Sequence, residues 1–232
     1  MAHCYLEANG ATVPEAFNVP SLVATVMEGR PPKLITLLRE PAVRLWVAYW
    51  TYGQYPARYG PSEVGFSHYV GNQTAAYRQC VATDGRGRRR CVLRFEAYGA
   101  AEAGVYYHAD QLLKGVYAAF LPEWQAALPL GHMLTLRTED YLARPTRTLR
   151  RVVGFLGARP FLPDEAREAS RLADADEYAA VVKRGHPLPA DRAVLERVRG
   201  FYAPFNLALA ALMHDDAFRW PDFERLYPGT AD

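Results

Sequence analysis

The sequence predicts one α/β domain in which a few parallel strands are flanked by helices. Two apolar runs of strand length, residues 34–38 and 133–136, are each followed at once by charged residues and a helical pattern. A short extended segment at residues 3–7, a helical pattern over 14–27 and the strand at 33–38 follow one another, and this order implies a right-handed parallel unit. No repeat, low-complexity segment or linker divides residues 1–232, so we expect a single domain.

The segment 33–49 predicts a strand, a tight turn and a helix. Its apolar run suits a strand buried on both faces. Pro41 suits the first turn of the helix, where a missing N–H does no harm. Arg39 then lies at the carboxyl end of the strand and beside a helix N-terminus, a place that favours anionic ligands. Arg39 is therefore a candidate phosphate ligand; the alternative is an ordinary surface charge.

The remaining elements follow from periodicity and turn signals. A short extended candidate at residues 3–7 ends in Asn9-Gly10, a turn signal. Apolar periodicity predicts helices over residues 14–27, 62–80, 106–128, 145–156, 163–173 and 191–212, the last bent near Pro204. Residues 49–59 read as a helix end running into a loop. The arginine run 86–90 reads as a solvated loop, with a contact to an anionic polymer as the alternative.

A basic loop follows the apolar pair Val181-Val182. It contains Lys183, Arg184, Gly185 and His186. Cations around a glycine can wrap a phosphate, because glycine lets the backbone approach closely. The alternative is a flexible charged loop.

Composition excludes some functions. The chain has 232 residues, half of them hydrophobic, and a net charge of +2, which argues against bulk nucleic-acid binding but allows a local basic pocket. No apolar run approaches the roughly 18–20 residues of a membrane span. The N-terminal residues resemble neither a signal nor a transit peptide, so a targeting segment or membrane anchor would lie outside this chain.

Two features favour a lumenal or extracellular protein. Cys80 and Cys91 flank a short polar stretch that a disulfide can close, although two free thiols, or one buried in the core, remain the alternative. Asn72-Gln73-Thr74 is an N-glycosylation acceptor triplet, a pattern that also arises by chance.

Four segments, taken together, resemble the carbohydrate sulfotransferases. LREPAVRLWVAYW is similar to the family's 3′-phosphate motif, and the cysteine pair followed by LLKGVYAAFLPEWQAALPLGHMLTLRTEDY is similar to its middle region. VKRGHP resembles its late nucleotide-clamping loop, and FYAPFNLALAALMHDDAFRW its C-terminal signature. The order agrees over roughly residues 33 to 220. Within the family, the chain most resembles the N-acetylgalactosamine 4-sulfate 6-O-sulfotransferases, in their C-terminal portion.

The resemblance implies a P-loop-like sulfotransferase core in the Golgi lumen, working without a metal. It implies transfer of a sulfuryl group from 3′-phosphoadenosine 5′-phosphosulfate (PAPS) to a sugar hydroxyl of a glycan or proteoglycan, with the N-acetylgalactosamine 6-hydroxyl favoured. YLEANGAT is similar to the family strand that ends in the catalytic glutamate, so Glu7 is the expected base.

The resemblance also assigns the nucleotide contacts. Arg39 is expected to hold the 3′-phosphate, and the loop Lys183–His186 to close over the nucleotide and stabilise the departing phosphate. Arg44 is expected to support the motif structurally. Glu139 and Asp140 are expected to serve strand-end structure first and acceptor contacts second.

Two departures from the family pattern keep a second function open. The serine of the 3′-phosphate motif is Val47 here, which removes a hydrogen bond worth about 1.5–3 kcal/mol. The family's 5′-phosphosulfate loop, which precedes the glutamate strand, is not found in the sequence. The chain is expected to be either an N-terminally truncated enzyme or a non-catalytic nucleotide- or glycan-binding relative. A nucleotide kinase is disfavoured because no G-x-x-x-x-G-K-[ST] loop occurs.

Overall fold

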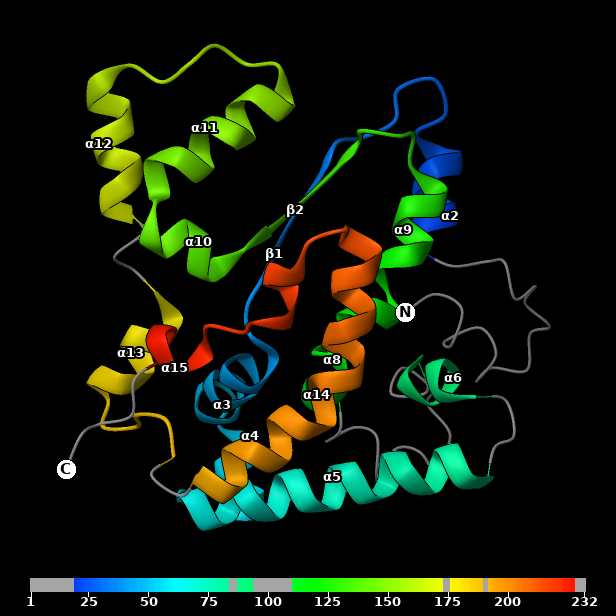
Figure 1. The fold of residues 1–232 in the computed structure, drawn as a ribbon, viewed down its shortest axis with the longest axis vertical. Coiled ribbons are helices and arrows are strands. Elements are labelled where there is room, and N and C mark those ends of the chain that lie inside the picture. The colour runs from blue at the N-terminus through cyan, green and yellow to red at the C-terminus, as the bar shows by residue number, and fades with distance from the viewer. Residues whose placement is uncertain (1–18, 84–86, 94–109, 173–175, 190–191, 228–232) are drawn as a thin grey trace.

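A computed structural model describes residues 19–83, 87–93, 110–172, 176–189 and 192–227 (Figure 1). Its elements, in chain order, are α2 (Val19–Val26), β1 (Leu34–Leu38), α3 (Pro41–Thr51), α4 (Gln54–Tyr59), α5 (Glu63–Thr83), α6 (Arg88–Leu93), α8 (Asp110–Lys114), η2 (Tyr117–Ala119), α9 (Leu121–Ala127), β2 (Met133–Arg137), α10 (Thr138–Ala143), α11 (Pro145–Leu156), α12 (Pro163–Leu172), α13 (Glu177–Lys183), α14 (Arg192–Met213), η3 (Asp216–Arg219) and α15 (Phe223–Leu226).

The predicted α/β architecture with parallel strands is confirmed for the described residues. β1 and β2 pair in parallel, with Leu34 opposite Met133 and Leu38 opposite Arg137. The expectation that β1 is buried on both faces is wrong. Ile35 and Leu37 are 37% and 47% exposed, whereas Leu38 is buried, the alternation of a strand that is covered on one face.

The core of the molecule forms around α3 rather than around the sheet. Eight of its residues are buried, namely Pro41, Ala42, Val43, Leu45, Trp46, Val47, Ala48 and Tyr49. α3 packs against α4, α8, α13 and α14, and its aromatic rings contact Phe66 and Tyr69 of α5 (Figure 1). A buried helix at this point places the turn that follows β1, and therefore Arg39, in a rigid setting.

The long helix expected over residues 106–128 is wrong where the structure describes it. The segment divides into α8, η2 and α9, with Gly115 at the first break. A Cβ at Gly115 would lie 2.8 Å from the ring of Tyr202, whose hydroxyl donates to the Leu112 carbonyl at 2.6 Å. The break therefore lets α14 approach closely. Pro122 then lies in the first turn of α9, a position that proline favours.

Two further expectations for local structure are wrong. The segment 49–59 carries α4 rather than a plain loop, and Arg88–Arg90 form the first turn of α6 rather than a solvated loop. Arg89 donates to the Ala119 carbonyl at 3.1 Å and pairs with Glu123, so tertiary contacts order this run. The helices predicted over 62–80, 145–156, 163–173 and 191–212 are confirmed as α5, α11, α12 and α14.

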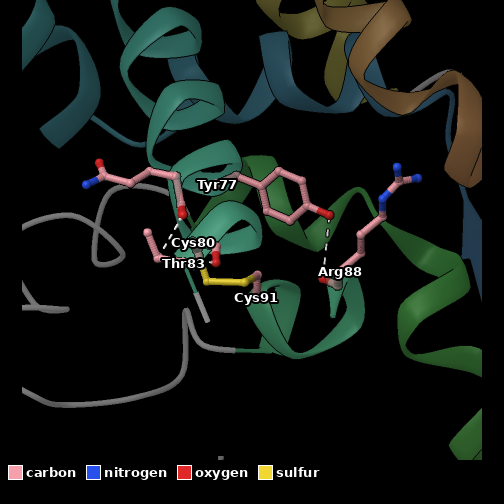
Figure 2. The surroundings of a disulfide bond; sticks show 6 residues. Tyr77, Cys80, Thr83, Arg88 and Cys91 are labelled. Atoms are coloured by element: carbon pink, nitrogen blue, oxygen red, sulfur yellow. Dashed lines mark hydrogen bonds between the residues drawn. A yellow bond between two sulfur atoms is a disulfide. The ribbon is translucent and has the colours of Figure 1, made fainter. Parts of the chain in front are cut away.

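A disulfide joins Cys80 of α5 to Cys91 of α6, with the two Cα atoms 5.9 Å apart (Figure 2). Beside it, the Tyr77 hydroxyl donates to the Arg88 carbonyl at 3.5 Å. The Tyr77 ring packs edge-on against Phe201 of α14. Asn72, the candidate glycosylation site, is exposed on α5.

Candidate functional site

A cavity of about 450 Å³ opens at the carboxyl ends of the two strands. This is where parallel α/β sheets place their ligands. The wall comes from β1, α3, α8, η2, α10 and α13, together with residues that flank these elements. It consists of Leu37, Arg39, Arg44, Val47, Ala48, Thr51, Tyr52, Gln111, Tyr117, Thr138, Tyr141, Leu142, Asp176 and Glu177.

Arg39 is held in the cavity wall by two interactions. Its guanidinium group pairs with the Asp176 carboxylate, and the two side chains are 10% and 13% exposed. Its carbonyl accepts from the Tyr117 hydroxyl at 2.9 Å. Asp176 is also the N-cap of α13, since it accepts from the Ala179 amide at 3.2 Å. The arginine at the sheet edge is thus coupled to the start of α13.

Arg44 lies at the next turn of α3 and also lines the cavity. Its guanidinium group donates to the side-chain oxygen of Gln111 at 3.1 Å and to the main-chain oxygen of the same residue. Its buried Nε has no hydrogen-bond partner in the described part of the chain. Arg44 therefore fastens α8 to α3, as a supporting residue would, while part of its charge faces the cavity.

Two buried carboxyl groups fix the turn after β1. Glu40 caps α3 by accepting from the Val43 amide at 2.8 Å, and its own amide donates to Glu139 Oε1 at 2.8 Å. Burial raises the pKa of Glu40 to about 7. The same Glu139 oxygen accepts from the Tyr227 hydroxyl at 2.8 Å. These bonds tie the ends of both strands to the C-terminal segment.

Arg137, the last residue of β2, extends this buried network. It pairs with Asp222 at 3.1 Å, and its guanidinium carbon lies 5.7 Å from the ring centroid of Trp220. Glu139 is 4% exposed. Glu139 accepts from the Glu40 amide and from Tyr227 and lies 3.9 Å from the Arg137 guanidinium group, so its contacts hold the strand ends together.

The predicted basic loop lies away from the cavity. Lys183, Arg184 and Gly185 are exposed, and His186 stacks on Trp50 with ring centroids 3.6 Å apart. The His186 carbonyl accepts from Trp46 Nε1 at 3.1 Å. None of these four residues lines the cavity, although Asp176 and Glu177 at the opposite end of α13 do. A helix of seven residues spans about 10 Å. The structure therefore links this loop to Arg39 through α13 without bringing the two together, and its nucleotide role stays a prediction.

Other predicted and unpredicted residues complete the site. Glu7 lies outside the described residues. Val47 is 4% exposed and lines the cavity. The sequence reasoning missed Asp176 and Gln111. An aspartate directly before a helical stretch is an N-cap signal that would have marked Asp176. Gln111 has no comparable signal in the sequence.

The sequence is similar to those of several carbohydrate sulfotransferases. Human carbohydrate sulfotransferase 15 is 27% identical over 188 residues, which are 81% of this chain and 31% of that protein. Its rat counterpart is 28% identical over 189 residues. Mouse heparan sulfate glucosamine 3-O-sulfotransferase 3B1 is 33% identical over 104 residues, or 40% of this chain and 26% of that protein. No protein-family model matches. The matched part spans 31% of the first of these curated relatives and 26% of the last.

Proposed function

This chain is a homologue of the carbohydrate sulfotransferases, and from that premise we propose that it carries the 3′-phosphate site of a PAPS-dependent enzyme that sulfates a sugar hydroxyl. The observation that carries the proposal is Arg39 in the wall of a cavity at the carboxyl end of β1. Helix α3 begins beside Arg39, and the dipole at its N-terminus favours a bound anion.

Arg39 holds the 3′-phosphate in this proposal. A phosphate carries more negative charge and more acceptor oxygens than the Asp176 carboxylate, and can form a two-pronged contact with guanidinium. On binding, the phosphate shares or replaces the contact with Asp176. Lys183, Arg184, Gly185 and His186, at the end of α13 opposite to Asp176, contact another part of the nucleotide in this proposal, as the resemblance of VKRGHP to the clamping loop suggests.

The transfer step conserves atoms and charge. The sugar hydroxyl oxygen forms a bond to sulfur as the bond from sulfur to the 5′-phosphate oxygen breaks. Glu7 accepts the hydroxyl proton as general base, and 3′-phosphoadenosine 5′-phosphate (PAP) leaves. No metal takes part in the proposed step. The acceptor class is a glycan or proteoglycan, with the 6-hydroxyl of N-acetylgalactosamine proposed from the sequence resemblance, and the compartment is the Golgi lumen.

Calorimetric titration with PAP tests the proposal. Removal of a charge-assisted contact costs about 1.5–3 kcal/mol, so Arg39→Ala should weaken PAP binding roughly 10- to 150-fold. Because that variant leaves Asp176 without its partner, Arg39→Ala/Asp176→Ala is the matched control and should be equally weak. Arg167→Ala, an exposed arginine of α12, should bind as the parent does. PAP binding that survives both Arg39 variants would remove Arg39 as the anchor.

A second candidate function rests on Val47. This side chain occupies the cavity wall where the family's motif has a serine, so the site lacks a hydroxyl for the phosphate. A non-catalytic nucleotide- or glycan-binding protein needs less affinity and no reactive geometry. Transfer of labelled sulfate from PAPS to desulfated chondroitin, measured on the longest gene product that contains this chain, separates the two. Incorporation supports the enzyme; binding of PAP without incorporation supports the second candidate.

A further inference from the structure

Helix α11 carries a concentration of positive charge that the proposed nucleotide site does not use. Arg144, Arg147, Arg150 and Arg151 are all exposed, with Arg144 as the N-cap residue. At 100° per residue their side chains leave the helix within an arc of about 120°, over an axial length of about 10 Å. We call these four residues the α11 arginine face.

Among the described residues, no neighbouring acid compensates these charges. None of the four guanidinium groups forms an ion pair within the described part of the chain, whereas the arginines beside α11 do. Arg167 pairs with Asp164 at 3.0 Å and Arg171 with Glu168 at 3.1 Å on α12. Glu165 is occupied by Arg159 at 2.6 Å. Four unpaired charges on one face contrast with a net charge of +2 for the whole chain.

The arginine face begins next to the cavity. Thr138, Tyr141 and Leu142 of α10 line the cavity, and Arg144 follows two residues later. From that point α11 rises alongside β2, away from the carboxyl end of the sheet (Figure 1). A polymer that lies along α11 can therefore present one of its units at the cavity mouth.

The chemistry of the face selects an anionic polysaccharide. Guanidinium groups bind carboxylates and sulfates through paired N–H donors, and a row of them suits a ligand with regularly repeated anions better than one small anion. Single-stranded nucleic acids are usually held by stacking on aromatic rings as well, and residues 144–151 contain no aromatic side chain. We propose that the α11 arginine face docks a polysaccharide bearing carboxylate and sulfate groups. This inference rests on the proposed function only where it takes that polysaccharide to be the acceptor of the sulfuryl group.

The test compares two double variants of the full chain by their binding to fluorescein-labelled chondroitin sulfate without nucleotide. Arg147→Ala/Arg151→Ala removes two charges from the face. Arg167→Ala/Arg171→Ala removes two exposed but paired arginines from the adjacent helix and is the control. We expect the first variant to bind at least about tenfold more weakly with a shallower salt dependence, and the control to bind within about twofold of the parent.

Three results would overturn the inference. They are unchanged binding by the first variant, an equal loss in both variants, or binding of an RNA of equal charge as tight as that of chondroitin sulfate. Alanine favours helix, so the variants should fold, as far-ultraviolet circular dichroism will show. Arg147→Gln/Arg151→Gln removes the charge but keeps a polar side chain, and gives a second measurement of the loss in binding. PAP affinity should stay unchanged in all of them, which keeps this test separate from that of Arg39.

Discussion

Val47 is the residue at which this site departs most clearly from the motif that it resembles. Its side chain is buried in α3 and borders the cavity into which Arg39 and Arg44 also project. A valine at this place fills space without offering a hydrogen bond. Affinity for the nucleotide should therefore depend strongly on this one side chain.

Restoring a hydroxyl at Val47 should strengthen nucleotide binding. Val47→Ser replaces the methyl groups by a hydroxyl that can donate to the phosphate, a hydrogen bond worth about 1.5 kcal/mol or roughly tenfold in affinity for PAP by calorimetry. Val47→Ala removes the same methyl groups without adding a hydroxyl and is the control. If the serine and alanine variants bind PAP equally, the phosphate does not reach Val47.

Glu40 should make the stability of the protein depend on pH. Burial raises the pKa of its carboxyl from 4.5 to about 7 in the folded state. Between pH 4.5 and 7 the Glu40 carboxyl is ionised in the unfolded chain but protonated in the folded chain. The free energy of unfolding therefore falls as the pH rises through this range, by about 3 kcal/mol in all. Above pH 7 this contribution is constant.

The Glu40→Gln variant tests this dependence by urea unfolding at several pH values. Glutamine can still accept from the Val43 amide but does not ionise, so the decline between pH 4.5 and 7 should become much smaller. Glu168→Gln, at the surface of α12, should retain the parent's profile. Parallel profiles for the parent and the Glu40 variant would contradict the assignment.

At the scale of the elements, the contact between α8 and α14 depends on one glycine. Gly115→Ala would place a methyl group 2.8 Å from the Tyr202 ring, and so should lower the free energy of unfolding by about 1–3 kcal/mol. Gly200→Ala, on α14 itself, meets nothing within 4 Å and should raise it by about 0.5–1 kcal/mol. Denaturant unfolding of both variants checks the prediction, which fails if the two shifts share a sign.

The same glycine shows which elements the sequence can predict. The strand at 34–38 and the helix at 145–156 carry their own periodic pattern, so local information defines them. The break at Gly115 was missed because its cause, Tyr202, is distant along the chain. α4 was missed because Gly53 and Pro56 look like breakers, although Pro56 lies in the first turn, where proline is tolerated.

In the candidate site, too, the sequence predicts what adjacent residues determine and misses what the packing of distant helices determines. The place of Arg39 follows from a strand, a turn and a proline that are adjacent in sequence. Its pairing with Asp176 could not be predicted, because it depends on how α13 packs against α3. The separation of Lys183–His186 from the cavity arises from the same packing, with His186 placed by its stack on Trp50.

At the scale of the whole molecule, the disulfide should contribute measurably to stability. The cysteines are 11 residues apart, and closing a loop of this size stabilises a fold by about 3 kcal/mol in the chain-entropy model. Cys80→Ala/Cys91→Ala should lose about this much in urea unfolding, and reduction of the parent with dithiothreitol should lose a similar amount. Reductant should leave the double variant unchanged; a further loss there would point to an effect unrelated to this bond.

The position of this disulfide also has a consequence for biosynthesis. The two cysteines emerge from the ribosome 11 residues apart, while α14 follows about 100 residues later, or roughly 5–20 s at ordinary rates of translation. In an oxidising compartment α5 and α6 can therefore be cross-linked before Phe201 exists to cover Tyr77. The last long helix then docks onto a platform that was assembled during translation.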